Sequence, residues 1–124
     1  QTLSCSNGNF TGYAQVTKII SSSGFFRPVL TSMAVTKYKI VRSNEQKGGD
    51  KANVNLLVSY WNGKKHVDVK SKSSDSMKQD SEWHNIDLAA STLPSYEGQV
   101  TADVQFIFDK SGPDPKCKIS LGPY

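Results

Sequence analysis

Two histidines, His66 and His84, are the side chains of this sequence best suited to proton transfer near neutral pH. Acting as acid and base, with a lysine to steady a phosphate group, they would form the centre of a small ribonuclease-like hydrolase. That chemistry requires the two imidazoles to converge in the fold. His66 and Asp68 alternate along one segment and can form a hydrogen-bonded pair, but such pairs are common on polar strand faces. A secreted hydrolase is therefore an alternative and not the leading hypothesis.

Motifs that assemble a catalytic or metal site within a short stretch are absent from the sequence. There is no Gly-x-Ser-x-Gly elbow, no His-Glu-x-x-His or Cys-x-x-Cys spacing, and no phosphate-binding glycine loop. The loop that begins at Asp109 lacks the alternating acidic ligands of a calcium site. The sequence therefore predicts no metal site and no cofactor.

The only two cysteines, Cys5 and Cys117, lie near the two ends of the sequence. We predict that they form a disulfide bond, the alternative being two unrelated buried thiols. Because disulfides persist in oxidising compartments, this pair predicts a secreted or periplasmic protein. The first residue, Gln1, agrees with removal of a signal peptide. The triplet that begins at Asn9 also matches the acceptor pattern for N-glycosylation.

Composition and charge restrict the class of partner. The 124 residues are 36% hydrophobic and 21% charged, which is typical of one globular domain spanning residues 1–124. The net charge of +4 permits attraction to anionic partners, but only Arg27 and Arg42 are arginine. Because bidentate phosphate recognition favours arginine, we expect no specific binding of nucleic acid. No apolar run approaches the roughly 20 residues that a membrane-spanning helix needs.

Apolar residues alternate with polar ones in several segments, which is the pattern of strands with one buried face. The clearest strand is predicted over 99–109 and the next over 54–60. Further strands are predicted at 13–20, 33–42, 83–88 and 117–121. Breaks are predicted at 21–24, 44–50, 71–81 and 111–115, with one helical turn within 87–96, before Pro94, and a frayed tail over 121–124.

The dipeptide Asn62-Gly63 predicts a tight hairpin after the strand 54–60. A two-residue type I′ turn there would pair Trp61 with Lys64 and Val58 with Val67. Seven or eight such strands without intervening helices predict an all-β fold, a single-domain antiparallel β-sandwich that is immunoglobulin-like in architecture. A small β-barrel is the alternative.

The predicted hairpin places Trp61 on the solvent-facing side, with Lys64, His66 and Asn55 nearby. An aromatic ring beside hydrogen-bonding groups is typical of protein-binding sites and can also stack on a sugar. Trp83 would extend this candidate binding site, because it alternates with the apolar positions of its own segment. The alternative is that Trp61 caps an edge of the sandwich and Trp83 fills the core.

The leading hypothesis is a secreted, non-enzymatic recognition domain that binds a protein or carbohydrate ligand through a sheet face or loops around Trp61, Lys64 and His66. The hydrolase that uses His66 and His84 is the second hypothesis. A secreted inhibitor or structural protein is the third, because an inhibitor would present a protruding loop at 71–81 or 111–115.

Overall fold

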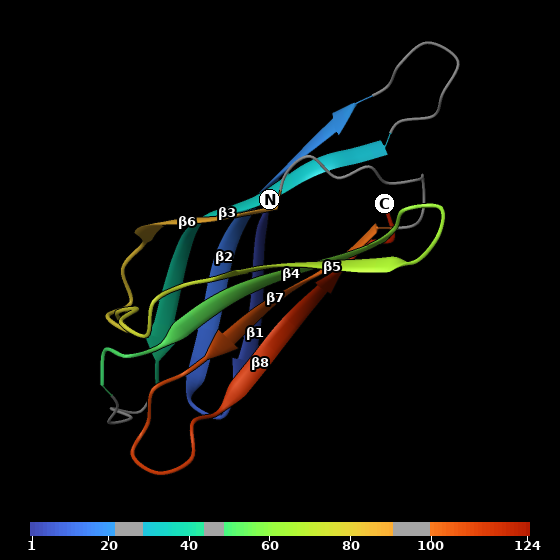
Figure 1. The fold of residues 1–124 in the computed structure, drawn as a ribbon. Coiled ribbons are helices and arrows are strands. Elements are labelled where there is room, and N and C mark those ends of the chain that lie inside the picture. The colour runs from blue at the N-terminus through green and yellow to red at the C-terminus, as the bar shows by residue number, and fades with distance from the viewer. Residues whose placement is uncertain (22–28, 44–48, 91–99) are drawn as a thin grey trace.

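The structure is a computed structural model that describes residues 1–21, 29–43, 49–90 and 100–124. Within these residues, eight strands form two antiparallel four-stranded sheets that pack face to face (Figure 1). The strands are β1 (Thr2–Asn7), β2 (Phe10–Ser21), β3 (Val29–Arg42), β4 (Asn53–Trp61), β5 (His66–Lys72), β6 (His84–Ala90), β7 (Val100–Ile107) and β8 (Lys116–Leu121). The predicted all-β sandwich is confirmed.

The strand order is β1-β2-β3-β6 in one sheet and β5-β4-β7-β8 in the other. The first three strands form a meander, and β6 joins them after the chain has formed β4 and β5 in the second sheet. In immunoglobulin domains the second strand instead pairs with the fifth. The likeness to that fold therefore extends to two packed antiparallel sheets and not to the strand order.

The core consists of the inward-facing half of each alternating strand. In β4, Val54, Leu56 and Val58 are buried, and in β7 the predicted alternation from Val100 to Phe106 is confirmed. The rings of Phe10 and Phe108 stack with their centroids 5.1 Å apart, and Phe106 stacks on Phe108 at 5.9 Å. Burial of each such side chain contributes about 1.5–3 kcal/mol, so this layer is the main source of stability.

Gly12 in β2 lies directly against the ring of Phe106 across the sandwich. A Cβ atom at position 12 would lie 2.5 Å from Phe106 Cγ, far inside van der Waals contact. We therefore expect Gly12→Ala to lower the free energy of unfolding by about 1–3 kcal/mol, as overpacked cores do, measured by urea unfolding. In the double variant Gly12→Ala/Phe106→Leu the loss should be smaller than the sum of the two single losses. Strict additivity would contradict the contact.

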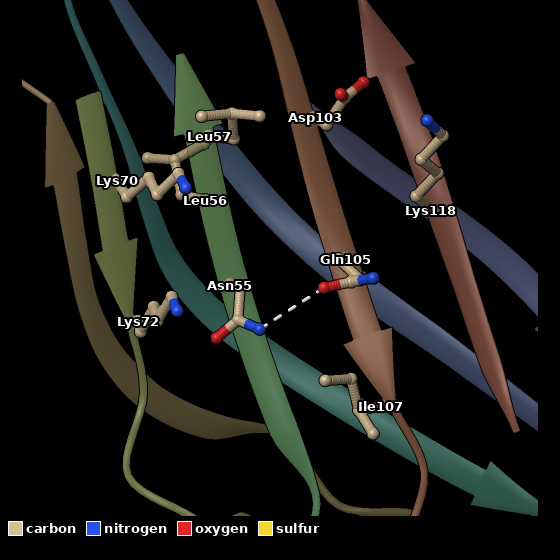
Figure 2. A pocket seen from close by; sticks show the side chains of 9 residues that line it. All are labelled: Asn55, Leu56, Leu57, Lys70, Lys72, Asp103, Gln105, Ile107 and Lys118. Carbon is tan, nitrogen blue, oxygen red and sulfur yellow. Dashed lines mark hydrogen bonds between the residues drawn. The ribbon is translucent and has the colours of Figure 1, made fainter. Parts of the chain in front are cut away.

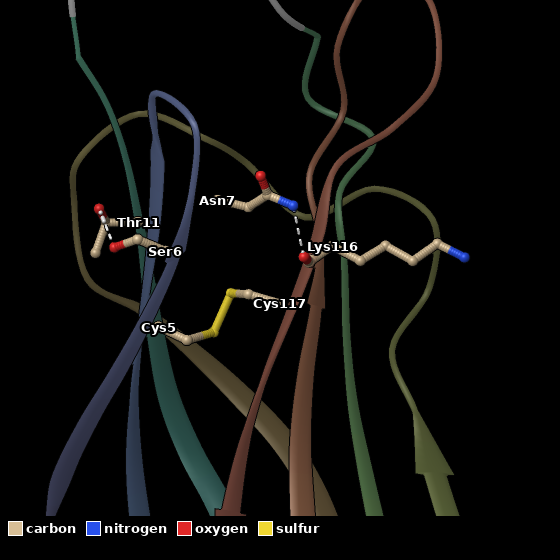
Figure 3. The surroundings of a disulfide bond; sticks show 6 residues. All are labelled: Cys5, Ser6, Asn7, Thr11, Lys116 and Cys117. Atoms are coloured by element: carbon tan, nitrogen blue, oxygen red, sulfur yellow. Dashed lines mark hydrogen bonds between the residues drawn. A yellow bond between two sulfur atoms is a disulfide. The ribbon is translucent and has the colours of Figure 1, made fainter.

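Both lateral edges of the sandwich are bridged. On one side Cys5 of β1 and Cys117 of β8 form the predicted disulfide, with their Cα atoms 5.9 Å apart. Beside it, Asn7 Nδ2 donates a hydrogen bond of 2.9 Å to the Lys116 carbonyl oxygen (Figure 3). On the other side, the Ala89 N–H of β6 donates to Ser71 Oγ of β5 at 3.3 Å. We refer to the β1–β8 contacts as the disulfide clasp.

The predicted hairpin register is wrong by two residues. The structure pairs Trp61 with His66 and Val58 with Val69, and the connection contains the four residues 62–65. Asn62 Oδ1 accepts hydrogen bonds from the N–H groups of Lys64 and Lys65, at 2.9 and 3.0 Å, and so supports the longer loop. The shift also places Val67 opposite the buried Tyr60, where the predicted register would have placed Lys65. A shift of two leaves every side chain on its predicted face.

Three other local predictions need correction. Strand β1 was not predicted, although the turn at Gly8-Asn9, with Gly8 at φ 60°, closes it against β2. The helical turn predicted within 87–96 is wrong over residues 87–90, which belong to β6, and the rest of that stretch lies outside the described residues. The tail is not frayed, because the Tyr124 N–H donates to the Val100 carbonyl at 2.8 Å.

The breaks predicted between strands agree with the structure in part. Residues 22–24 and 44–48 of the two earlier breaks lie outside the described residues. The break at 71–81 begins only after Lys72, the last residue of β5. The break predicted at 111–115 is confirmed between β7 and β8, and its residues 111–114 are exposed.

Candidate functional site

The solvent-facing side of the β5-β4-β7-β8 sheet, which we call the outer face, carries a nearly continuous set of polar side chains. Strand pairing aligns these residues in rows that cross all four strands. Read in the order β5-β4-β7-β8, one central row is formed by Lys72, Asn55, Gln105 and Lys118. The other is formed by Lys70, Leu57, Asp103 and Ser120. Each row therefore joins residues that are far apart in the sequence.

A shallow recess of about 390 Å³ lies over these rows (Figure 2). Asn55 and Gln105 form the middle of its floor, where Asn55 Nδ2 donates to Gln105 Oε1 at 3.4 Å. The half-buried side chains of Leu57 and Ile107 supply small apolar surfaces on either side. The recess thus combines carboxamide groups with limited apolar area.

The charged side chains around the recess differ in whether they have a partner. Its one carboxylate, Asp103, accepts a hydrogen bond of 2.7 Å from Ser120 Oγ. Lys70, Lys72 and Lys118 are exposed, and none of them forms an ion pair within the part of the chain that the structure describes. Asn55 Oδ1 is shielded from solvent and accepts no hydrogen bond from any described residue. The recess therefore offers positive charge at its rim that is not neutralised by the described residues.

Trp61 and His66 lie on the same outer face as the recess, at the far end of β4. They are directly paired across the two strands, with ring centroids 5.2 Å apart in an edge-on arrangement. Asn55 lies six residues away along β4, which is about 20 Å. Lys64 is exposed in the connecting loop. The structure thus brings Trp61 and His66 together as predicted, but it places Asn55 in the recess and away from them.

Trp83 lies on the opposite side of the molecule, against the β1-β2-β3-β6 sheet. Its ring contacts Tyr13 edge-on, with centroids 6.5 Å apart, and Lys39 Nζ lies 5.0 Å from the Trp83 centroid. The alternative that Trp83 fills the core is wrong, because the residue is 37% exposed. Trp83 and Trp61 therefore belong to different surfaces and do not form one patch.

His84 is held in a local network near the start of β6. Its ring stacks on Tyr38, and its Nε2 lies 2.7 Å from Asp80 Oδ1. Burial acts to raise the pKa of Asp80, but the hydrogen bonds from His84 and the Glu82 N–H outweigh it, so the pKa lies below its ordinary value. Burial likewise raises the pKa of Tyr38.

The two histidines lie at opposite ends of the sandwich. The segment that leads into His84 is anchored beside the start of β4, where Met77 pairs with Ala52. His66 pairs with Trp61, the last residue of β4. The structure therefore does not bring the imidazoles together, and a shared acid–base site is not formed.

The two loops suggested for an inhibitor differ in character. Within the first, Gln79 is fully buried and fixes the segment to the body of the domain. The second, at 111–114, is exposed, and its Asp114 carboxylate accepts a hydrogen bond from the Lys110 N–H. The first loop is therefore tied to the body of the domain at Gln79, although most of its other residues are exposed.

Comparisons of the chain with protein-family models, with curated protein sequences and with solved structures found no match. In the described ranges, no group of histidine, cysteine, aspartate or glutamate side chains is arranged to hold a metal ion. The same residues contain no helix with the length and apolar character needed to cross a bilayer.

Proposed function

We propose that this protein is a secreted, non-enzymatic recognition domain that binds a carbohydrate on its outer face. The observation that carries the proposal is the recess over Asn55 and Gln105. Its volume of about 390 Å³ lies within the usual range for small-ligand sites, about 300–1,000 Å³. Paired carboxamides can donate to and accept from sugar hydroxyls, and Leu57 and Ile107 can contact the apolar face of a sugar ring.

A carbohydrate suits this surface better than a protein. Protein interfaces have aromatic-rich, apolar centres from which lysine is depleted. The recess contains no aromatic side chain among its lining residues and three lysines. Trp61 and His66, about 20 Å away on the same face, are where a longer saccharide lying along β4 would stack on an aromatic ring.

The disulfide supports the extracellular part of the proposal. Cys5 and Cys117 are joined, and disulfides of this structural kind form and persist in oxidising compartments. The secreted or periplasmic location predicted from the cysteines is accordingly part of the proposed function.

The test is a binding screen with neutral and acidic oligosaccharides, followed by titration calorimetry with the best binder. We expect Asn55→Ala/Gln105→Ala to weaken binding about tenfold, because each lost hydrogen bond contributes about 0.5–1.5 kcal/mol. The control is Asn85→Ala, which removes an exposed carboxamide from the opposite sheet and should leave binding unchanged. Equal loss in both variants, or no saccharide bound by the unaltered protein, would contradict the proposal.

A further inference from the structure

The charges at the recess specify the kind of saccharide that it would hold. Lys72 and Lys118 end the same row on opposite flanks, and Lys70 lies in the adjacent row beside Leu57. All three ammonium groups are free of ion pairs within the described residues, whereas Asp103 is already engaged by Ser120. The recess therefore presents unbalanced positive charge to a ligand, and an anionic ligand is complementary to it.

The spacing of these lysines favours a ligand of low charge density. Adjacent strands lie about 4.8 Å apart, so the Cα atoms of Lys72 and Lys118, which are three strand intervals apart, are separated by about 14 Å. Lys70 and Lys72 are two positions apart on β5, or about 7 Å. Phosphate or densely sulfated groups are held best by convergent donors and by the forks of arginine, and no arginine lines the recess. Dispersed single charges instead match one carboxylate per sugar ring.

The carboxamides on the floor add a requirement that an anion alone does not meet. Asn55 and Gln105 line the recess, and carboxamide groups form hydrogen bonds with hydroxyl groups. The ligand should therefore carry both carboxylates and hydroxyls.

We infer that the recess binds a uronate oligosaccharide, with the carboxylates near Lys70, Lys72 and Lys118 and the ring hydroxyls over the carboxamides of Asn55 and Gln105. This inference rests on the proposed carbohydrate-binding function and adds the charge of the ligand to it. It also assigns a role to Asp103, whose carboxylate limits the affinity for an anion at the centre of the site.

The test uses calorimetric titration of the full chain with oligogalacturonate and with the same oligomer after methyl esterification, which removes the charge and keeps the ring. We expect the ester to bind at least tenfold more weakly. Lys70→Gln/Lys72→Gln/Lys118→Gln should weaken binding of oligogalacturonate about thirtyfold, and added salt should reduce the difference. Asp103→Asn keeps an oxygen for Ser120 and should strengthen binding about threefold.

The matched control is Lys37→Gln/Lys51→Gln/Lys110→Gln, which removes the same charge from exposed positions outside the recess. It should change binding less than threefold, and a loss equal to that of the recess variant would overturn the inference in favour of general surface attraction. Equal binding of acid and ester would overturn the inference but leave carbohydrate recognition standing. Preference for dextran sulfate or for polyglutamate over oligogalacturonate would also overturn it. If no saccharide of either charge binds, the proposed function fails as well.

Discussion

Replacing Cys5 and Cys117 together by serine is expected to lower the free energy of unfolding by about 4–5 kcal/mol. The bond joins residues separated by 112 positions, so it restricts nearly the whole unfolded chain. In the chain-entropy model a loop of that length contributes about 4.8 kcal/mol, and removal of native disulfides from small domains costs about 2–5 kcal/mol. Because such domains are stable by about 5–15 kcal/mol in total, this loss is large. Urea unfolding of both forms measures it.

The slope of the unfolding curve distinguishes the two ways in which the bond can act. If it restrains the unfolded chain, the serine variant should expose more surface on unfolding and show a larger m-value. Asn7→Ala, which removes only the neighbouring hydrogen bond to the Lys116 carbonyl, should cost about 1 kcal/mol with no change in m. A loss below about 1 kcal/mol in the double serine variant would show that the disulfide clasp contributes little.

Replacing Gln79 by leucine is expected to cost about 3 kcal/mol, although leucine has a similar volume and more apolar surface. Gln79 is 1% exposed, and its Nε2 donates to the carbonyl oxygens of Gly49 and Asp109, at 2.6 and 2.9 Å. Its Oε1 accepts from the Asp109 N–H at 2.9 Å. Leucine would leave these three backbone groups without a partner, and each buried unsatisfied group costs about 1–3 kcal/mol. Thermal and urea unfolding measure the loss.

Gln79→Glu is the sharper variant, because it replaces only the amide nitrogen by oxygen and so reverses two hydrogen bonds. A carboxylate oxygen would face the two carbonyl oxygens that now accept from the amide. Burial without a donor raises the folded-state pKa of the new carboxyl, so the variant should be least stable at high pH and regain stability as the pH falls through that value. Lys78→Gln, at the exposed neighbouring position, should leave stability within about 0.5 kcal/mol of the original. A pH-independent loss in Gln79→Glu would contradict the assigned amide orientation.

The fold followed from side-chain alternation because one face of each strand is buried. Residues such as Val54, Leu56 and Val58 can be assigned to the core without knowing which strand lies beside them, since period-two burial is a local property. The pairing of the cysteines was predictable for a different reason, because two cysteines allow a single pairing.

The register of the β4–β5 hairpin and the presence of strand β1 depend on side-chain and turn contacts, which the alternation of apolar residues does not reveal. Asn62-Gly63 is compatible with a two-residue turn, but the Asn62 side chain caps two N–H groups and stabilises a four-residue loop. Strand β1 carries mostly small polar residues and has no apolar run to identify it. The Gly8-Asn9 dipeptide was the available hairpin signal.

The candidate site was predicted only in part. Trp61 and His66 share a face because the strand period fixes their direction, whatever the register. The recess could not be predicted, because Asn55 meets Gln105 and Lys118 only through the order β4-β7-β8, which alternation within single strands does not determine. Trp83 is exposed, but it lies just before β6 and on the other surface of the molecule, which alternation could not predict for the same reason.

The disulfide clasp also bears on how this protein behaves toward other copies of itself. Strand β1 contributes only the half-buried Leu3 and Cys5 to the interior, so once the sulfur bridge to β8 is reduced it is held mainly by its hydrogen-bonded pairing with β2. Its departure would uncover the main-chain donors and acceptors of β2, and unprotected strand edges of that kind recruit further chains into aggregates. Reduction by a thiol should therefore cause the protein to aggregate, measured as turbidity, at temperatures below that at which the rest of the domain unfolds.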